Sequence, residues 1–328
     1  MKILYAASNN QNARIQLSRF MRAMEGSEHQ IKIAAYKQSS PKGLNIDWTL
    51  DALLNIYRPE LLSLNNDNLG IYYEQLKQFA PDLVISDLEY FTSYLANLLN
   101  ITLWQCSSSL LKYGVAGTYN LGLFKYYAHS LNRDPIHTQR TANLIDNSNL
   151  NLIYSHFGDA NTPLELMDNF EWIRPYHQIS KLSVPCKHHV VAGFSESDVR
   201  VLDVLKRYED SVVFMESCAE KYHNVHVKDI GNEDEYYCNL RNSFYFLCQG
   251  QASFLADAFY NGKFSFIYPN YKDAETIINS HLSVNLGLGQ IMHPQMDMIF
   301  SSITGVTSNY QGSIKYLHEK IADYAVCR

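Results

Sequence analysis

The sequence predicts an α/β fold made of two domains. Short apolar runs, typical of buried strands, alternate in the N-terminal half with segments whose apolar residues recur at helical spacing, and this alternation is typical of a parallel sheet. The alternation stops in a stretch rich in Pro, Lys and His after residue 176, and a second alternation begins near residue 188. The length of 328 residues suits two domains of about 150 residues each.

The first half is expected to begin with a strand at residues 3–7, followed by a helix whose apolar residues include Ile15, Leu17 and Phe20. The elements expected after these are a strand at 29–36, helices at 48–56 and 70–79, a strand at 81–87, a helix at 91–100, a strand at 101–107, and helical segments to about residue 145. The apolar run at 81–87 ends in Asp87, so this carboxylate is expected at the carboxyl edge of the sheet.

The second half repeats the pattern. The expected elements are a strand and turn at 188–195, a helix at 196–208, strands at 211–216, 224–230 and 242–248, a helix at 250–258, a strand at 264–268, a helix from about 273, and an amphipathic last helix at 313–325.

Composition excludes several classes of function. The net charge of −6 and the absence of a basic run disfavour a nucleic-acid partner without excluding it. The six Cys are scattered with no C-x-x-C pair, which argues against structural zinc and for a reducing compartment. No apolar run approaches the roughly 18 residues of a membrane span, and no leader opens the chain. We therefore expect a cytoplasmic protein without a membrane span or a metal site.

Residues 249–289 carry the strongest functional signal. Gly250 ends an apolar run and opens a helix, and a glycine turn at a helix N-terminus attracts anions because unpaired N–H groups and the helix dipole act together. Asp257 lies further along that helix, where it is placed to accept hydrogen bonds from sugar hydroxyls. Asp273 and Glu275 lie in the first turn of the following helix. Phosphate and hydroxyl recognition together indicate a nucleotide.

The spacing of this segment resembles the H-G-G-x-x-T-x-x-E-A-L-x-x-G-x-P-x-x-x-x-P motif of nucleotide-sugar glycosyltransferases with the GT-B fold. Gln249, Gly250 and Gln251 match H-G-G, Asp257 matches the Glu, and Phe254 replaces the Thr. The sequence KDAETIINS at 272–280 is similar to the KDxQQxxNA segment of the enzyme that adds N-acetylglucosamine to the lipid-linked peptidoglycan precursor. As a pattern of spacing the match is moderately specific.

The resemblance implies a GT-B fold, in which two Rossmann-like domains with parallel sheets face each other across a cleft. The expected divisions are an acceptor domain at 1–176, a linker at 177–187, a donor domain at 188–310, and a C-terminal helix at 311–328 that crosses back onto the first domain.

The resemblance also implies a donor site in the second domain. The residues it places there are Gly193, Phe194 and Ser195 in a strand–helix turn, Val227 and Ile230 near the base, Gln249, Gly250, Gln251, Ala252 and Ser253 at the diphosphate, Asp257 at the ribose, and Asp273 and Glu275 at the sugar. Each position also has a structural interpretation as an ordinary turn, a helix cap or a surface acid. Uridine is the expected nucleoside of the donor.

Inverting transfer needs a base that removes a proton from the acceptor. The first strand–helix loop contains neither His nor an acid, so its side chains can at most orient a substrate. The acceptor-side residues of that loop are Asn9, Asn10, Gln11 and Asn12. Asp87 is the preferred candidate base and Glu89 the second, although an Asp at a strand end is also an ordinary cap or turn residue.

We therefore expect an enzyme, an inverting and metal-independent hexosyltransferase that moves a sugar from a nucleotide-diphosphate sugar, with UDP as the default, to an unidentified small-molecule, glycan or lipid-linked acceptor. It needs no cofactor besides that co-substrate. One alternative is a catalytically degenerate GT-B protein that binds a nucleotide sugar or acts as a partner subunit. A nucleotide-sugar epimerase is the third hypothesis.

Overall fold

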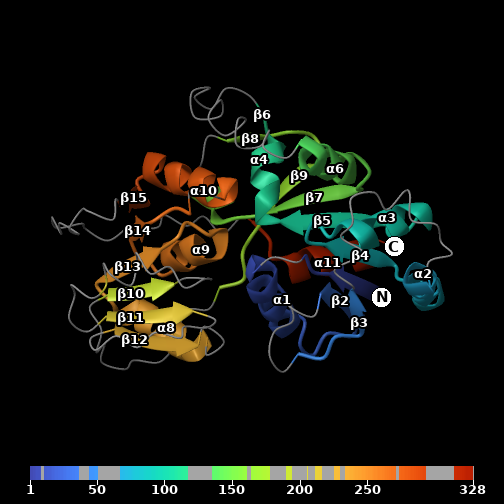
Figure 1. The fold of residues 1–328 in the computed structure, drawn as a ribbon, viewed down its shortest axis with the longest axis horizontal. Helices are drawn as coiled ribbons and strands as arrows, with labels where there is room; N and C mark the ends of the chain where they lie inside the picture. The colour runs from blue at the N-terminus through green and yellow to red at the C-terminus, as the bar shows by residue number, and fades with distance from the viewer. Residues whose placement is uncertain are drawn as a thin grey trace. The chain divides into compact units, whose positions relative to one another are not determined.

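A computed structural model gives the fold of the chain (Figure 1). It describes residues 1–8, 11–36, 44–50, 67–116, 135–160, 164–177, 190–193, 205, 211–215, 225–229, 233–270, 273–292 and 314–327. The chain divides into two compact units. Unit 1 consists of Met1–Tyr154, Pro163–Tyr176 and Ile314–Arg328, and unit 2 consists of Ser155–Thr162 and His177–Ser313.

Unit 1 is built on a sheet that, within the described residues, has seven strands in the order β3-β2-β1-β4-β5-β7-β9, all parallel. The strands are β1 (Lys2–Ala6), β2 (Gln30–Tyr36), β3 (Trp48–Leu50), β4 (Leu83–Ser86), β5 (Leu103–Ser107), β7 (Leu150–Tyr154) and β9 (Phe170–Ile173). The unit also contains η4 (Ser108–Leu110), α4 (Leu111–Gly114), β6 (Val115–Ala116), α6 (Pro135–Asp146) and β8 (Glu165–Leu166).

Helices cover both faces of this sheet because alternate strand residues point to opposite sides. Tyr5 of β1 lies in the core under α1 (Gln11–Ala23) and α11 (Leu317–Val326). Its neighbour Leu4 lies in the core under α2 (Asp67–Phe79) and α3 (Tyr90–Leu98). The last helix therefore packs on the N-terminal unit. Its Tyr324 ring lies 5.1 Å from that of Trp104, and the Tyr324 hydroxyl is 3.1 Å from Thr102 Oγ1.

Unit 2 repeats the plan with a parallel sheet in the order β12-β11-β10-β13-β14-β15. Its elements are η5 (His156–Gly158), β10 (Val190–Gly193), β11 (Ser211–Met215), β12 (Val225–Asp229), α8 (Glu233–Asn242), β13 (Tyr245–Cys248), α9 (Ala252–Tyr260), β14 (Ser265–Ile267), α10 (Ala274–Asn285) and β15 (Gly289–Ile291). Counted along the unit, this order is 3-2-1-4-5-6, the doubly wound arrangement of a Rossmann fold.

One expected element is wrong in kind. Residues 48–50 form strand β3 and do not begin a helix, and residues 51–56 of the expected helix lie outside the described part. Trp48 and Leu50 are buried while Thr49 is exposed, the two-residue period of a strand. The Trp48 ring meets Tyr72 and Phe79 of α2 edge to face, with centroids 5.4 and 5.7 Å away. Of the expected helix at 196–208, the structure describes only Leu205.

Residues Ser155–Thr162 belong to unit 2, although the expected first domain included them. The reason is their contact with α9. The His156 ring lies 5.4 Å from that of Phe259, and the Tyr260 hydroxyl donates to Asp159 Oδ2 over 2.6 Å. These contacts attach a short excursion of the chain to unit 2 before it returns to form β8 and β9 in unit 1.

The burial of His156 predicts a pH effect on stability. Desolvation lowers the pKa of His156 from 6.5 to about 3, so between these values the unfolded chain binds a proton that the folded chain does not. Stability must therefore fall as the pH drops through this window, by at most about 1.4 kcal/mol per pH unit for one group. His156→Phe, which cannot be protonated, is expected to flatten the pH dependence of the urea midpoint below pH 6.5. The matched control is His29→Phe, because His29 is only half-buried. If the urea midpoint of the wild type and that of His156→Phe change equally with pH below pH 6.5, His156 is not the group responsible.

Candidate functional site

In each sheet the strand order reverses between two neighbouring strands, β1 and β4 in unit 1 and β10 and β13 in unit 2. The connections that leave the carboxyl ends of such a strand pair run in opposite directions. They leave a crevice there, which is where open α/β sheets bind their ligands. The two switch points are therefore the places that this fold offers for chemistry.

At the switch point of unit 2, a tight turn sets where α9 begins. Gly193 ends β10 and is paired in register with Cys248 at the end of β13. Gly250 follows with a φ of +88°, in the left-handed region that favours glycine. A Cβ on Gly250 would meet Ser280 Oγ and would lie 2.7 Å from the backbone oxygen of Thr276, so only glycine lets the turn pack this closely against α10.

The N-terminus of α9 has no side-chain cap. Gln251 is the N-cap residue, and its side chain makes no hydrogen bond to the first-turn N–H groups. It donates through Nε2 to Gln249 Oε1 over 3.0 Å, and both glutamines are buried. An uncapped N-terminus carries unsatisfied N–H donors and the positive end of the helix dipole, and both favour an anion.

Small polar side chains are buried beside this N-terminus, and one of them is Ser253, which the resemblance placed at the diphosphate. Ser253 lies in the first turn of α9 and is 2% exposed. On α10 the buried polar residues recur at helical spacing along one face, and they are Thr276, Asn279, Ser280 and Ser283. Ser253 Oγ, Asn279 Nδ2 and Ser283 Oγ have no hydrogen-bond partner among the described residues. Buried polar atoms are normally satisfied, often by water or a ligand, so this patch suits polar contacts.

The acidic residues expected at the sugar start α10. Asp273 is its N-cap, and Asp273 Oδ1 accepts a hydrogen bond from the backbone N–H of Glu275 over 2.9 Å. Asp273 is half-buried and Glu275 is 9% exposed. The capping role is visible in the geometry, and a contact with the donor sugar stays a prediction.

Asp257 is engaged inside unit 2. Its side chain is 0% exposed, and its carboxylate accepts hydrogen bonds from the hydroxyls of Tyr236 (3.2 Å) and Tyr237 (3.0 Å) of α8. A ribose hydroxyl would meet a carboxylate that is buried and already accepts two hydrogen bonds. The geometry therefore assigns Asp257 to holding α8 against α9, and it does not favour the expected ribose contact.

Phe254, which stands where the resembling motif has Thr, fills the space beside Gly193. A Cβ on Gly193 would lie 2.7 Å from Cδ1 of the Phe254 ring, and that ring is fully buried. The remaining expected donor residues cannot be placed as fully. Phe194, Ser195 and Ile230 lie outside the described residues, and Val227 lies in β12 with its side chain undescribed.

At the switch point of unit 1, Ser8 and Asp87 are paired. Ser8 follows β1, Asp87 follows β4, and Ser8 Oγ donates to Asp87 Oδ2 over 2.7 Å. Asp87 is 2% exposed and Ser8 is half-buried, so the hydroxyl is the more accessible of the two groups. The sequence indicated Asp87 as a base and placed Ser8 in the loop on the acceptor side, but it did not indicate that the two side chains are paired. The only signal for the pairing was the place of Ser8 after the first strand, next to the strand that leads to Asp87.

The other candidates of unit 1 fall into two groups. Asn9 and Asn10 lie outside the described residues, and Gln11 and Asn12 begin α1 with undescribed side chains. Glu89 is the N-cap of α3, and its environment is fully described.

The Glu89 carboxylate accepts hydrogen bonds from the backbone N–H groups of Phe91 (3.0 Å) and Thr92 (2.6 Å) and from the Tyr36 hydroxyl (2.9 Å). Burial and this acid together raise the pKa of the Tyr36 hydroxyl. Both carboxylate oxygens are therefore occupied at a site 2% exposed. We assign Glu89 to capping and do not carry it forward as a base.

Two further features concern the described part of the chain as a whole. It contains no group of three or more His, Cys, Asp or Glu side chains that could hold a metal ion. None of its helices is long and apolar enough to cross a membrane.

Comparison with known proteins identifies the fold. No protein-family model and no curated protein matches the chain. Solved structures do match over 90% of this chain and 86% of theirs. They include the spinosyn rhamnosyltransferase SpnG (13% identity, TM-score 0.59), the spinosyn forosaminyltransferase SpnP (16%, 0.55) and the calicheamicin glycosyltransferase CalG4 (15%, 0.56). The chain therefore has the GT-B fold, as the resemblance implied.

The environment of Asp257 predicts a large effect of its removal on stability. Asp257→Ala removes a carboxylate that accepts hydrogen bonds from two buried tyrosine hydroxyls. The loss of each of these hydrogen bonds is expected to cost about 1–3 kcal/mol of unfolding free energy. Asp257→Asn keeps one carbonyl oxygen and should lose less. Chemical denaturation of both variants, and of Asp257→Ala combined with Tyr236→Phe and Tyr237→Phe, gives the measurement. The triple variant should recover part of the loss, and a cost below about 0.5 kcal/mol for Asp257→Ala would show that the carboxylate is not so engaged.

Proposed function

We propose that the chain is an inverting glycosyltransferase that moves a sugar from a nucleotide-diphosphate sugar to a hydroxyl group of a small-molecule acceptor. The observation that carries the proposal is the uncapped N-terminus of α9 at the switch point of unit 2, with buried hydroxyl and amide groups beside it. Among the solved structures with the same fold, SpnG occurs as a complex with thymidine diphosphate and as a complex with spinosyn aglycone.

The donor diphosphate is proposed to bind at the first turn of α9. Its negative charge is matched by the backbone N–H groups and the helix dipole, and Ser253 Oγ supplies a hydroxyl donor there. Asn279 on α10 adds an amide with a free donor position. We keep uridine as the proposed nucleoside of the donor and test thymidine alongside it. Both carry a pyrimidine base that could hydrogen-bond to the backbone near Val227.

The acceptor is proposed to be activated by the Ser8–Asp87 pair. Ser8 Oγ already donates to Asp87, so Ser8 can take the acceptor proton as it passes its own to Asp87 Oδ2. The acceptor oxygen then forms a bond to the anomeric carbon as the bond from that carbon to the diphosphate oxygen breaks. A single displacement of this kind inverts the anomeric centre. The charge that develops on the leaving diphosphate is stabilised at α9, which requires no metal ion in this scheme.

A second candidate, a GT-B protein that binds a nucleotide sugar without transferring it, is favoured by two observations. Phe254 offers no hydroxyl to a phosphate, and the Asp257 carboxylate is already occupied by tyrosine hydroxyls. Such a protein would bind the donor but release no nucleoside diphosphate. The epimerase hypothesis gains no support from the residues that the structure describes.

The proposed roles predict a graded loss of turnover. Asp87→Asn removes the base with little change in shape and is expected to lower kcat by about 10²-fold or more, while donor affinity stays the same. Ser8→Ala is expected to lower kcat by about tenfold, because Asp87 can still act directly. The assay is release of nucleoside diphosphate from UDP- and TDP-sugars over a panel of phenolic, macrolide and sugar acceptors, with donor binding measured by calorimetry.

The matched control for Asp87→Asn is Asp82→Asn, because Asp82 lies just before β4 and Asp87 just after it. The matched control for Ser8→Ala is Ser18→Ala, on α1. Full activity of Asp87→Asn would remove Asp87 from the mechanism. A wild-type protein that binds the donors but releases no diphosphate with any acceptor of the panel would favour the binding protein.

A further inference from the structure

The turn that follows β4 contains a residue in an uncommon conformation. Leu88 has a φ of +52°, in the left-handed region that favours glycine. It stands between Asp87, which is bonded to Ser8, and Glu89, the N-cap of α3. Because a leucine enters this region only at a cost in free energy, contacts around the turn must hold it there.

The faces of the sheet explain why the turn is so tight. Alternate residues of β4 point to opposite sides. Val84 packs in the core under α2 and α3, whereas Ile85 packs in the core under α1 and α11. The same alternation puts Ser86 on the α3 side and Asp87 on the opposite side. The N-cap of α3 follows directly after Leu88, so this one residue brings the chain back to the α3 side.

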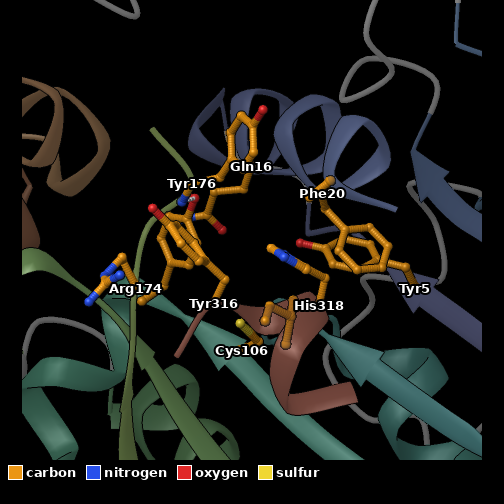
Figure 2. A pocket seen from close by; sticks show the side chains of 11 residues that line it. Tyr5, Gln16, Phe20, Cys106, Arg174, Tyr176, Tyr316 and His318 are labelled. Carbon is orange, nitrogen blue, oxygen red and sulfur yellow. Dashed lines mark hydrogen bonds between the residues drawn. The ribbon is translucent and has the colours of Figure 1, made fainter. Parts of the chain in front are cut away.

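Two groups on the opposite face indicate where the Asp87 carboxylate lies. Tyr5 and Cys106 line a small cavity under α1 and the start of α11, and Figure 2 shows both side chains. Burial raises the pKa of the Tyr5 hydroxyl and of the Cys106 thiol, and the charge of Asp87 raises both further. Both groups stay uncharged, so neither holds the carboxylate as an ion-pair partner.

On the α3 side, the Ser86 side chain spans the turn. Ser86 Oγ accepts a hydrogen bond from the backbone N–H of Glu89 over 2.8 Å and donates to the backbone oxygen of Glu89 over 3.1 Å. Ser93 Oγ lies 2.9 Å from Ser86 Oγ and 2.6 Å from the same Glu89 oxygen. Gln105 Nε2 of β5 donates to Ser93 Oγ over 3.1 Å. The two residues that flank Asp87 and Leu88 are thus tied to each other and to the next strand.

These bonds go beyond what a helix cap requires. Capping of α3 accounts for the bonds from the N–H groups of Phe91 and Thr92 to the Glu89 carboxylate. It does not account for the bonds of Ser86 to the Glu89 backbone, nor for the Tyr36 hydroxyl, which reaches the carboxylate from β2. A set of five residues makes these further bonds, and we name it the turn latch: Tyr36, Ser86, Glu89, Ser93 and Gln105. Each is at most 2% exposed, and a polar network buried in this way is rigid.

We propose that the turn latch positions the base: it holds Leu88 in the left-handed conformation and thereby keeps the Asp87 carboxylate on Ser8. Its members are positioning residues, because they act through Asp87 and not on the substrate. The turn is also held from β1, since the backbone N–H of Asp87 donates to the Ala6 oxygen over 2.9 Å. The inference rests on the proposed function for the role of Asp87, whereas the bonds that hold Leu88 do not depend on that role.

The first test compares glycine with alanine at position 88 in a Ser86→Ala protein. Both remove the leucine side chain, but only glycine adopts a positive φ without a penalty. Ser86→Ala is expected to lower kcat for release of nucleoside diphosphate about tenfold at unchanged KM for the donor, because it misplaces the base alone. Adding Leu88→Gly is expected to give a kcat at least about fivefold above that obtained by adding Leu88→Ala.

The matched control for the glycine substitution is Ala80→Gly. Ala80 has a φ of +45°, but it is exposed and precedes β4. Ala80→Gly in the Ser86→Ala protein is therefore expected to restore no turnover.

Amide hydrogen exchange, followed by NMR, tests the latch without catalysis. The N–H groups of Asp87, Phe91 and Thr92 are bonded on both sides of Leu88. In the Ser86→Ala protein their exchange is expected to be at least about fivefold slower with Leu88→Gly than with Leu88→Ala, because glycine keeps the turn closed more of the time.

A milder pair of variants serves if Ser86→Ala does not fold. Tyr36→Phe removes only the hydroxyl bonded to Glu89, over 2.9 Å. Tyr72→Phe is its matched control, because the Tyr72 hydroxyl is buried in the same core and lies 3.0 Å from Thr92 Oγ1. The two variants are expected to lose similar stability, while Tyr36→Phe lowers kcat at least about threefold more than Tyr72→Phe.

Three results would each overturn the proposal: an unchanged kcat in Ser86→Ala, equal exchange with glycine and alanine at position 88, or equal kcat in Tyr36→Phe and Tyr72→Phe. All three leave the proposed function standing as long as the wild type releases diphosphate. If the wild type releases none, the proposed function fails, and the exchange comparison alone decides whether the latch holds the turn.

Discussion

The close packing of the Gly250 turn against α10 is the constraint on which the rest of unit 2 depends. The left-handed φ of Gly250 turns the chain at the carboxyl end of β13, and the lack of a side chain lets it touch Ser280 and Thr276. The start of α9 is thereby fixed beside the strand that ends in Gly193. From that start, helical spacing places Phe254 over Gly193 and Asp257 under the α8 tyrosines.

The same packing accounts for the composition of α10. A helix that approaches a glycine turn closely needs small side chains on that face, and Thr276, Asn279, Ser280 and Ser283 are small or short. Small apolar side chains would have allowed the same close packing against the Gly250 turn. The Thr276 hydroxyl donates to the backbone oxygens of Asn270 and Asp273, and the Ser280 hydroxyl donates to that of Thr276. Asn279 Nδ2 and Ser283 Oγ have no partner among the described residues, and buried polar atoms of this kind suit a polar ligand. In unit 1 the switch point instead holds a carboxylate with a hydroxyl already bound to it, a group that accepts protons. In the proposed function the sheet of unit 1 supplies the base and that of unit 2 supplies donors for an anion, the two functions that metal-independent sugar transfer needs.

The sequence predicted the features that depend on local pattern. The alternation of apolar runs and helices, the turn at Gly250 and the amphipathic last helix all follow from residues close together in the chain. Strand β3 was missed because three residues are too few to show a two-residue period, and the apolar run at Leu150–Tyr154 and helix α8 were not foreseen. Glu89 carried a local signal for capping, since it stands just before a helix start, but its acidity suggested catalysis.

What the sequence could not show depends on contacts between distant segments. Ser8 and Asp87 are 79 residues apart and meet only because β1 and β4 are neighbours. Asp257 is engaged by two tyrosines 20 and 21 residues earlier, and nothing in the motif around it indicates that its carboxylate is occupied.

The most direct test of the central claim, that the N-terminus of α9 is an anion site, is calorimetric titration of UDP, TDP and the matching uncharged nucleosides into the wild type and Ser253→Asp. An Asp in the first turn is compatible with the helix dipole, so the fold is expected to persist while the new carboxylate repels a diphosphate. The account predicts that a diphosphate binds the wild type at least tenfold more tightly than its nucleoside, and that Ser253→Asp loses this advantage while nucleoside affinity stays the same. Unchanged diphosphate affinity in a folded Ser253→Asp protein would contradict it.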